Sequence, residues 1–359
     1  MLRAGLVGLP ASGKTTLFQL LTSAREAPKI HGKAEAHVGI ARVPDDRLDR
    51  LTALFQPQKR VPATVEFADV GAARGDAKAL YDVVAYRNAD ALLHVVRAFR
   101  DNAVPHPLQS IDLARDVRTI EDELILADLG VVERRLERLA KDLKKSASPE
   151  LKREQEILSR AREGLEAGRA IRTMEIAGDD ARRMRGFQLL SAKPLLLVVN
   201  VDEADVGIAE TAARLPELAP FLGSAGAGAV GVCAKIELEI AQLDPADARA
   251  FMADLGLHQS GLDRVIRAAY DLLGYISFFT VGDDECRAWS IPRETRAEEA
   301  AGAIHSDIQR GFIRAEVVRC EALLSRGSLA ACREHGELRL EGKDYLVADG
   351  DVITFRHAT

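Results

Sequence analysis

The sequence predicts an α/β protein whose main domain is a doubly wound, mainly parallel sheet. Short apolar runs typical of strands alternate with stretches of helical periodicity: LRAGLVG, ATVEFADV, ADALLHVVRAF and, after a long interruption, KPLLLVVNV and GAVGVCA. Strands that alternate with helices in this way usually lie parallel in one sheet. The interruption, residues 110–190, has a different periodicity and predicts a helical insertion into this domain.

The composition is that of an ordinary globular protein with more than one domain. The chain has 359 residues, 47% hydrophobic and 29% charged, and this length suggests two or three domains. No apolar stretch approaches the roughly 18 residues that span a bilayer, and the four cysteines show no CxxC pairing. We therefore expect a cytoplasmic protein without a membrane anchor, disulfide framework or zinc site. The net charge of −6 argues against a chain that coats nucleic acid all over.

The first strand leads into a phosphate-binding motif. GLPASGKT matches G-x-x-x-x-G-K-[ST] and stands between a strand-like run and the helical pattern KTTLFQLLTSA, which is the context that this motif requires. Backbone N–H groups of the loop can cradle the β-phosphate, while Lys14 reaches the β and γ oxygens and acts catalytically. The alternative is a glycine turn that merely packs. The predicted nucleotide-binding residues here are Gly8, Ala11, Ser12, Gly13, Lys14, Thr15 and Thr16.

A magnesium ligand is predicted at the end of a neighbouring strand. Asp69 closes the run ATVEFAD and suits the Walker B position, where an acidic residue holds Mg²⁺ together with the hydroxyl of the P-loop, here Thr15. An ordinary acidic residue at a strand end is the alternative. The two motifs together predict a P-loop protein that binds a nucleoside triphosphate with Mg²⁺.

The run KPLLLVVNVDEAD is predicted to deliver base-reading residues to the same ligand. A Ras-like GTPase reads guanine with Asn-Lys-x-Asp, because the short carboxylate accepts from two guanine N–H groups. In this chain Glu203 is one methylene longer and Val201 replaces the lysine. The pattern favours adenine, with Asn200 as donor and acceptor. A surface loop and a retained GTP site are the alternatives, and two further nucleotide contacts are predicted at Cys233 and Ala234.

Residues 110–190 predict two antiparallel helices that form a coiled coil. Apolar residues recur at intervals of three and four, Ser146 to Pro149 breaks the pattern, and a compatible spacing then resumes. Residues 134–172 contain twelve Lys or Arg and only seven Asp or Glu, which is an excess of positive charge. This excess is either a solvated helix surface or a basic prong for RNA or another acidic partner. The seam residues are Leu129, Val132, Leu136, Leu139 and Leu143, then Leu151, Leu158, Ala161 and Leu165.

The tail from about residue 278 predicts a small mixed α+β module. Its strand-like runs are FFTVG, RAWSI, FIRAEVV, GELRLEGKDYLV and GDVITFRH, with one helix around residues 297–308.

These blocks resemble the YchF family of Obg-like ATPases. The resemblance is carried by GLVGLP, GKTTLF, VPDDRLDRL, NVDE, SGLDRVIRAAYDLLG, AAGAIHSDIQRGFIRAEV and LEGKDYLVADGDV, and it runs almost end to end. It implies a discontinuous P-loop G domain over residues 1–109 and 191–276, the helical insertion over 110–190, and a β-grasp TGS domain over 277–359. It also implies a preference for ATP over GTP and an association with ribosomes.

Both switch regions depart from the family pattern. Ala11 replaces an Asn that can help to hold potassium in related GTPases, so potassium activation is doubtful. No Ser or Thr lies between Ser23 and Thr52 to serve as the switch I threonine, and the alignment places Lys33 there. In switch II, the expected D-x-x-G becomes Asp69-Val70-Gly71-Ala72, so the γ-phosphate contact falls to Gly71 or Ala72 or is lost.

His106 is the candidate for positioning the attacking water. It lies in DNAVPHP after the third strand and matches a histidine of the family pattern near the nucleotide. A neutral imidazole can orient water, although an incidental loop histidine is the alternative. The sequence thus favours a slow, monomeric ATPase that binds ribosomes or RNA through the hairpin and the TGS domain. A non-hydrolysing ATP scaffold and a GTP-binding protein are the other hypotheses.

Overall fold

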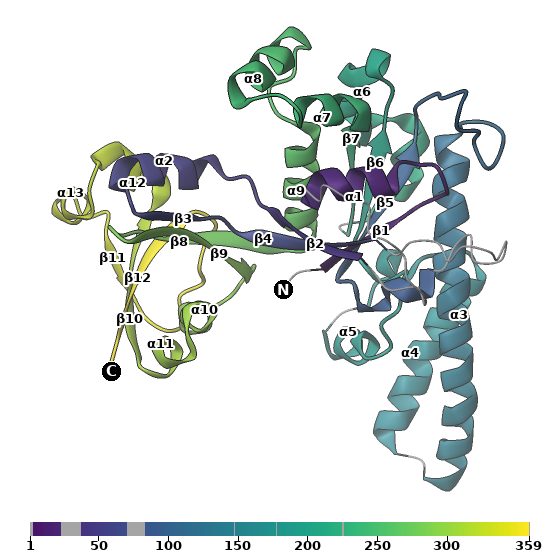
Figure 1. Ribbon diagram of the computed structural model, residues 1–359. Coiled ribbons are helices and arrows are strands. Elements are labelled where there is room, and N and C mark those ends of the chain that lie inside the picture. Colours follow the sequence, from purple (N-terminus) through teal and green to yellow (C-terminus); the bar gives the residue numbers. More distant parts are fainter. Residues whose placement is uncertain are drawn as a thin grey trace. The chain divides into compact units, whose positions relative to one another are not determined.

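The computed structural model describes residues 3–22, 37–69, 83–146, 148–176, 178–224 and 226–358 (Figure 1). The chain divides into two compact units, Met1–Ala41 with Glu66–Leu272, and Arg42–Val65 with Leu273–Thr359. The sequence-based boundaries assigned residues 42–65 to the nucleotide-binding domain, whereas these residues pack with the C-terminal part of the chain. In the described part of the chain, no helix is long and apolar enough to cross a membrane.

The first unit contains a six-stranded sheet in the order β2-β4-β1-β5-β6-β7. The pairs β1–β4, β1–β5, β5–β6 and β6–β7 are all parallel, which confirms the predicted doubly wound, mainly parallel sheet. Its strands are β1 (Arg3–Val7), β2 (His37–Arg42), β4 (Thr64–Asp69), β5 (Ala91–Arg97), β6 (Leu195–Asn200) and β7 (Ala227–Val232).

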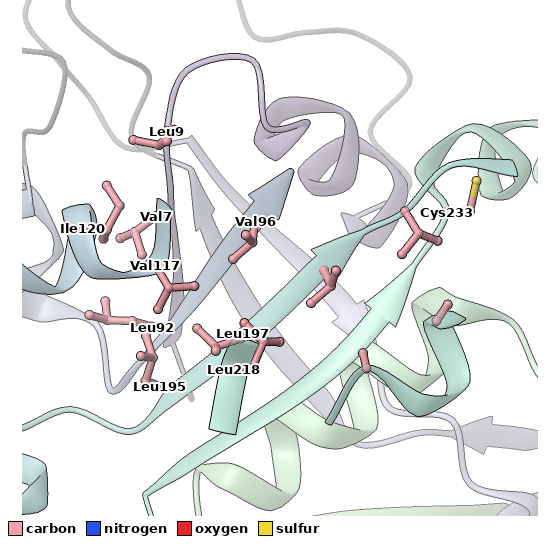
Figure 2. Packing of buried hydrophobic residues seen from close by; sticks show 14 of the residues in the cluster. Val7, Leu9, Leu92, Val96, Val117, Ile120, Leu195, Leu197, Leu218 and Cys233 are labelled. Carbon is pink, nitrogen blue, oxygen red and sulfur yellow. The ribbon is translucent and has the colours of Figure 1, made fainter. Parts of the chain in front are cut away.

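The neighbouring interior strands β5 and β6 are buried at every position. Their nearly continuous apolar sequences suit strands that are covered on both faces. On one face, Leu92 and Leu197 pack near Val117 and Ile120 of the helical insertion (Figure 2). The helices and 3-10 turns of this sheet domain are α1 (Lys14–Thr22), η2 (Val83–Asn88), η4 (Glu203–Asp205), α6 (Val206–Thr211), η5 (Ala212–Arg214), η6 (Pro216–Phe221), α7 (Ala234–Ile240), α8 (Pro245–Asp254) and α9 (Gly261–Leu272).

The insertion is a pair of helices, α3 (Leu113–Lys145) and α4 (Pro149–Glu166), followed by η3 (Ile171–Thr173) and α5 (Gly178–Arg185) (Figure 1). Asp112 caps the start of α3 and Ser148 the start of α4, where each side chain accepts a backbone N–H. The helices pack through one apolar cluster, and five of its fully or nearly buried members belong to the predicted seam. These are Val132, Leu139, Leu158, Ala161 and Leu165.

A buried carboxylate joins α3 to the segment that precedes β6. Asp128 is fully buried and accepts hydrogen bonds from the N–H groups of Leu190 (2.9 Å) and Ser191 (2.7 Å), while the Arg87 guanidinium lies 3.5 Å away. Burial raises the pKa of Asp128, and the two N–H groups and Arg87 oppose that rise. The backbone before β6 is thereby fixed against the helix.

The second unit is a mixed sheet in the order β11-β10-β12-β8-β9-β3, as expected for the α+β module of the tail. The first residues of β3 and β9 pair in parallel, Lys59 with Glu285 and Arg60 with Cys286. Its elements are α2 (Asp46–Phe55), β3 (Lys59–Val61), β8 (Tyr275–Thr280), β9 (Glu285–Pro292), α10 (Ala297–Ile304), α11 (Ser306–Arg310), β10 (Phe312–Arg319), α12 (Cys320–Arg326), α13 (Leu329–Glu334), β11 (Arg339–Glu341) and β12 (Asp351–His357).

The α2 segment is held in this second unit by an ion pair and by apolar burial. Arg47 lies 2.7 Å from Asp349 and places its guanidinium 5.2 Å from the centre of the Phe279 ring. Leu48 and Leu51, on the apolar face of α2, are fully buried. The amphipathic helix that precedes β3 therefore completes the core of the C-terminal unit.

Candidate functional site

The P-loop joins β1 to α1 and needs its glycines for steric reasons. Gly8 and Gly13 have φ angles of 145° and 94°, which favour glycine. A Cβ atom at Gly8 would lie 2.4 Å from the carbonyl oxygen of Val95, and one at Gly13 would lie 2.5 Å from the side-chain nitrogen of Asn200. The loop is thus packed tightly against β5 and β6. Its final residues open α1, whose first-turn N–H groups have no intrahelical partner.

The side chain of Lys14 folds back over the P-loop. Its Nζ donates to the carbonyl oxygens of Gly8 (2.9 Å) and Leu9 (2.8 Å). Burial lowers the pKa of Lys14 to about 8, and the nearby charge of Asp69 opposes that shift. Lys14 is therefore a desolvated cation held by two neutral acceptors, so an anionic phosphate group would stabilise its charge.

Thr15 and Asp69 come together as predicted. The Thr15 hydroxyl donates to Oδ2 of Asp69 at 3.2 Å. Asp69 is buried, and burial raises its pKa, while the positive charge of Lys14 opposes the rise. A hydroxyl and a buried carboxylate are hard oxygen donors, so this pair fits Mg²⁺, which is usually bound by one or two protein oxygens with phosphates and water. The described ranges contain no cluster of three or more His, Cys, Asp or Glu residues that could hold a metal.

A cavity of about 630 Å³ lies beside the P-loop. It is lined by residues from the P-loop and α1, the loop after β5, the loop after β6, and the start of α7. Its size suits a small ligand. The predicted nucleotide contacts that line it are Ala11, Gly13, Thr16, Asn200, Val201, Glu203, Cys233 and Ala234.

Asn200 connects the parts of this cavity. Its side-chain nitrogen donates to the carbonyl oxygen of Ser12 at 3.2 Å, and its side-chain oxygen accepts the N–H of Ala234 at 3.1 Å. Asn200 is 4% exposed. One N–H and one lone pair remain available in the hydrogen-bonding capacity of the amide. Asn200 therefore braces the P-loop against the turn before α7, and its base contact stays a prediction.

The rest of the NVDE stretch has distinct roles in the structure. Val201 is buried, and Glu203 forms an ion pair with Lys235, which also lines the cavity. Asp202 accepts the backbone N–H of Arg100 at 3.2 Å and so holds the loop after β5. The carboxylate that would meet a base in Ras-like GTPases is thus engaged with a lysine in this chain.

The His106 side chain is buried, and both of its ring nitrogens form hydrogen bonds. Its Nδ1 accepts the backbone N–H of Leu108 at 3.1 Å, and its Nε2 therefore donates to Asp116 at 2.9 Å. The His106 side chain is 5% exposed. Neither ring nitrogen is free for a water in this arrangement, so the catalytic role of His106 stays a prediction and requires the loop to rearrange.

The sequence prediction missed the residues of the loop after β5. Phe99, Arg100, Asp101, Asn102 and Val104 line the cavity, and the buried Arg97 lies behind them. The only sequence signal was an arginine that ends the apolar run ALLHVV. The predicted switch residues Lys33, Gly71 and Ala72 lie outside the described residues.

Comparisons with known proteins extend over the whole chain. The family model YchF-GTPase_C, described as "Protein of unknown function (DUF933)", matches residues 275–358. The chain is 42% identical to the ribosome-binding ATPase YchF of Bacillus subtilis (strain 168), with 99% of each chain covered. It is 35% identical to Obg-like ATPase 1 of Oryza sativa subsp. japonica, and this match covers 99% of this chain and 92% of the relative. A solved structure of the Schizosaccharomyces pombe YchF GTPase matches with a TM-score of 0.85 at 29% identity, over 99% of this chain and 97% of the other. These matches confirm the resemblance carried by the sequence blocks, and the chain belongs to the YchF family of Obg-like ATPases.

Proposed function

We propose that the chain binds ATP with Mg²⁺, hydrolyses it slowly, and uses the bound nucleotide to control an association with ribosomes. The observation that carries this proposal is the continuity of the site. Asn200 links the P-loop, with Lys14 and the Thr15–Asp69 pair, to a cavity of about 630 Å³ that can take a nucleobase. The names of the relatives, ribosome-binding ATPase and Obg-like ATPase, support the same activity.

The residues divide the work of binding and hydrolysis. Lys14 would exchange its two carbonyl acceptors for oxygens of the β and γ phosphates, where its charge offsets the charge that develops during transfer. Thr15 and Asp69 would hold Mg²⁺, which supplies electrostatic stabilisation of the phosphates when bound. The N–H groups of the P-loop orient the phosphate chain. This set provides positioning and charge, which are the main needs of phosphoryl transfer.

ATP is proposed as the preferred nucleotide. The Glu203 carboxylate is paired with Lys235, and Val201 is buried, so the stretch does not present the short free carboxylate that clamps guanine. GTP binding is the weaker candidate. Competition of ATP and GTP for one fluorescent nucleotide tests this proposal, and equal or tighter binding of GTP would contradict it.

A second candidate function is an ATP-binding scaffold without appreciable hydrolysis. It is favoured by the engagement of both ring nitrogens of His106 and by the absence of a Ser or Thr between Ser23 and Thr52 in the sequence. Single-turnover hydrolysis with ATP and Mg²⁺ separates the two functions, with Lys14→Ala as the blank. A rate above that of Lys14→Ala supports the ATPase, and a rate equal to it supports the scaffold.

The helical hairpin is the proposed partner surface, together with the C-terminal unit. Five basic side chains on α3 are exposed, and none of them forms an ion pair with another described residue. Their charge would favour RNA phosphates and make the association salt-dependent. A ribosomal partner also implies a cytoplasmic protein. The five residues are Arg134, Arg138, Lys141, Lys144 and Lys145.

Charge reversal tests this surface by cosedimentation with ribosomes. Reversing Arg134, Arg138 and Lys141 to Glu should weaken binding and flatten its salt dependence. The matched control reverses three arginines of α5, Arg182, Arg183 and Arg185, which are also exposed. Unchanged cosedimentation of the α3 variant, or an equal loss in the control, would contradict the assignment.

A further inference from the structure

Arg97 is a buried cation without a carboxylate partner among the described residues. It ends β5 directly opposite Asn200 of β6 and is 3% exposed. A charged group removed from water normally requires a compensating partner. The guanidinium of Arg97 instead donates to backbone carbonyl oxygens and lies over an aromatic ring. The burial of Arg97 is therefore compensated by neutral carbonyl groups and an aromatic ring.

The carbonyl groups that Arg97 contacts belong to two walls of the nucleotide cavity. Its Nη2 donates to Val104 at 2.8 Å and, less closely, to Asp101 at 3.4 Å. Its Nε donates to Phe99 at 3.2 Å, and its Nη1 makes a long contact of 3.4 Å to Ala11 of the P-loop. All four of these residues line the cavity. One guanidinium therefore closes the loop after β5 and ties it to the P-loop.

The same guanidinium fixes the aromatic side chain of that loop. The central carbon of the Arg97 guanidinium lies 4.4 Å from the centre of the Phe99 ring, which is within the range of a cation–π contact. Phe99 lines the cavity, and it is the only aromatic side chain among the described residues that do. An aromatic ring held in place beside a cavity offers a stacking surface for a planar base.

We propose that Arg97 is a positioning residue that holds Phe99 as the stacking surface for the nucleobase and couples this surface to the P-loop through Ala11. The inference rests on the proposed binding of a purine nucleotide in this cavity. Arg97 does not touch the base in this proposal. It acts through Phe99, so its effect is confined to ligands that carry a base.

A purely structural role for Arg97 predicts different results. If Arg97 served only to stabilise the P-loop, its loss would weaken ligands with and without a base to the same extent. If it acted through its charge alone, Arg97→Lys would restore wild-type binding, whereas the planar fork and the ring contact are specific to arginine.

The test compares ADP with inorganic tripolyphosphate, which has phosphates and no base, by calorimetric titration of the full-length protein. Wild type, Arg97→Met, Arg97→Lys, Phe99→Leu and the Arg97→Met/Phe99→Leu double variant are measured, with thermal unfolding as the control for folding. We expect each single Met or Leu variant to weaken ADP by about tenfold (~1.4 kcal/mol) and to change tripolyphosphate by less than about twofold. The double variant should bind ADP about as tightly as the weaker-binding single variant, because both substitutions remove the same stacking surface. Arg97→Lys should recover only part of the ADP affinity.

Several outcomes would overturn the proposal. These are an equal loss for ADP and tripolyphosphate in Arg97→Met, additive losses in the double variant, complete rescue by lysine, or unchanged ADP binding in Phe99→Leu. If Arg97→Met does not fold, Phe99→Leu and Arg97→Lys still decide, because unchanged ADP binding in either one would contradict the proposal. Wild-type protein that binds neither ADP nor tripolyphosphate would instead contradict the proposed nucleotide function.

Discussion

Nucleotide affinity should depend on pH through Lys14. Burial lowers the pKa of this lysine to about 8, and its Nζ is held by the carbonyl oxygens of Gly8 and Leu9. In the complex, the phosphates would surround the same amine with negative charge and raise its pKa again. Binding above pH 8 must therefore be accompanied by the uptake of a proton at Lys14, and each further rise in pH makes binding less favourable.

The expected magnitude follows from the pKa of about 8. At pH 7 about nine-tenths of Lys14 is already charged, so pH should have little effect below that point. At pH 9 only about one-tenth is charged, and the dissociation constant of ADP should be roughly tenfold higher than at pH 7, a change of ~1.4 kcal/mol. Between these values the slope should increase gradually and approach one decade per pH unit above pH 9.

The assay is a calorimetric titration of ADP at several pH values from 7 to 9.5, repeated in two buffers with different ionisation enthalpies. The difference between the buffers reports the number of protons taken up. Lys14→Met serves as the matched control, since it should bind more weakly with no proton uptake across this range. A flat dissociation constant in the wild type, or the same pH slope in Lys14→Met, would refute the reasoning.

Three further predictions concern stability and base choice. Burial lowers the pKa of His94 from 6.5 to about 3, so the folded state binds fewer protons than the unfolded state below pH 6.5 and loses stability as the pH falls towards 3. His94→Leu should therefore lower the pH at the midpoint of acid unfolding, measured by circular dichroism. An unchanged midpoint would contradict this prediction. Asp128→Ala leaves two buried N–H groups unpaired and should cost roughly 3 kcal/mol in urea unfolding, whereas the exposed Asp122→Ala on the same helix should cost less than about 0.5 kcal/mol. Glu203→Asp combined with Val201→Lys should raise GTP affinity relative to ATP in nucleotide competition, and an unchanged ratio would argue against base reading by this stretch.

The sheet and the P-loop could be predicted because their patterns are local. The spacing of Gly8, Gly13 and Lys14 allows few backbone paths, and the unbroken apolar sequences of β5 and β6 suit strands buried on both faces. The seam of α3 and α4 was equally local, since its members repeat along each helix and meet their neighbours through one interface.

The rest depended on contacts between distant residues. The pattern of α2 indicates an apolar face but does not say which core will bury it, and Leu48 and Leu51 are buried in the second unit. An arginine at a strand end usually remains in solvent, so the burial of Arg97 could not be predicted from its position alone. The partner of His106, Asp116, lies ten residues further on in α3, and nothing in the loop sequence announces that hydrogen bond.

The membership of residues 42–65 in the second unit matters for anyone who divides this protein by genetic means. A fragment that begins at Leu273 lacks β3, which pairs with β9, and it lacks Arg47, the ion-pair partner of Asp349. Conversely, a truncation before Leu273 retains α2 but removes the unit in which Leu48 and Leu51 are buried. Either cut exposes apolar side chains that can cause aggregation. A loss of activity in such a truncated protein would therefore combine the absence of a domain with the misbehaviour of the part that remains. A clean excision of the second unit needs residues 42–65 joined to its N-terminus by a flexible linker.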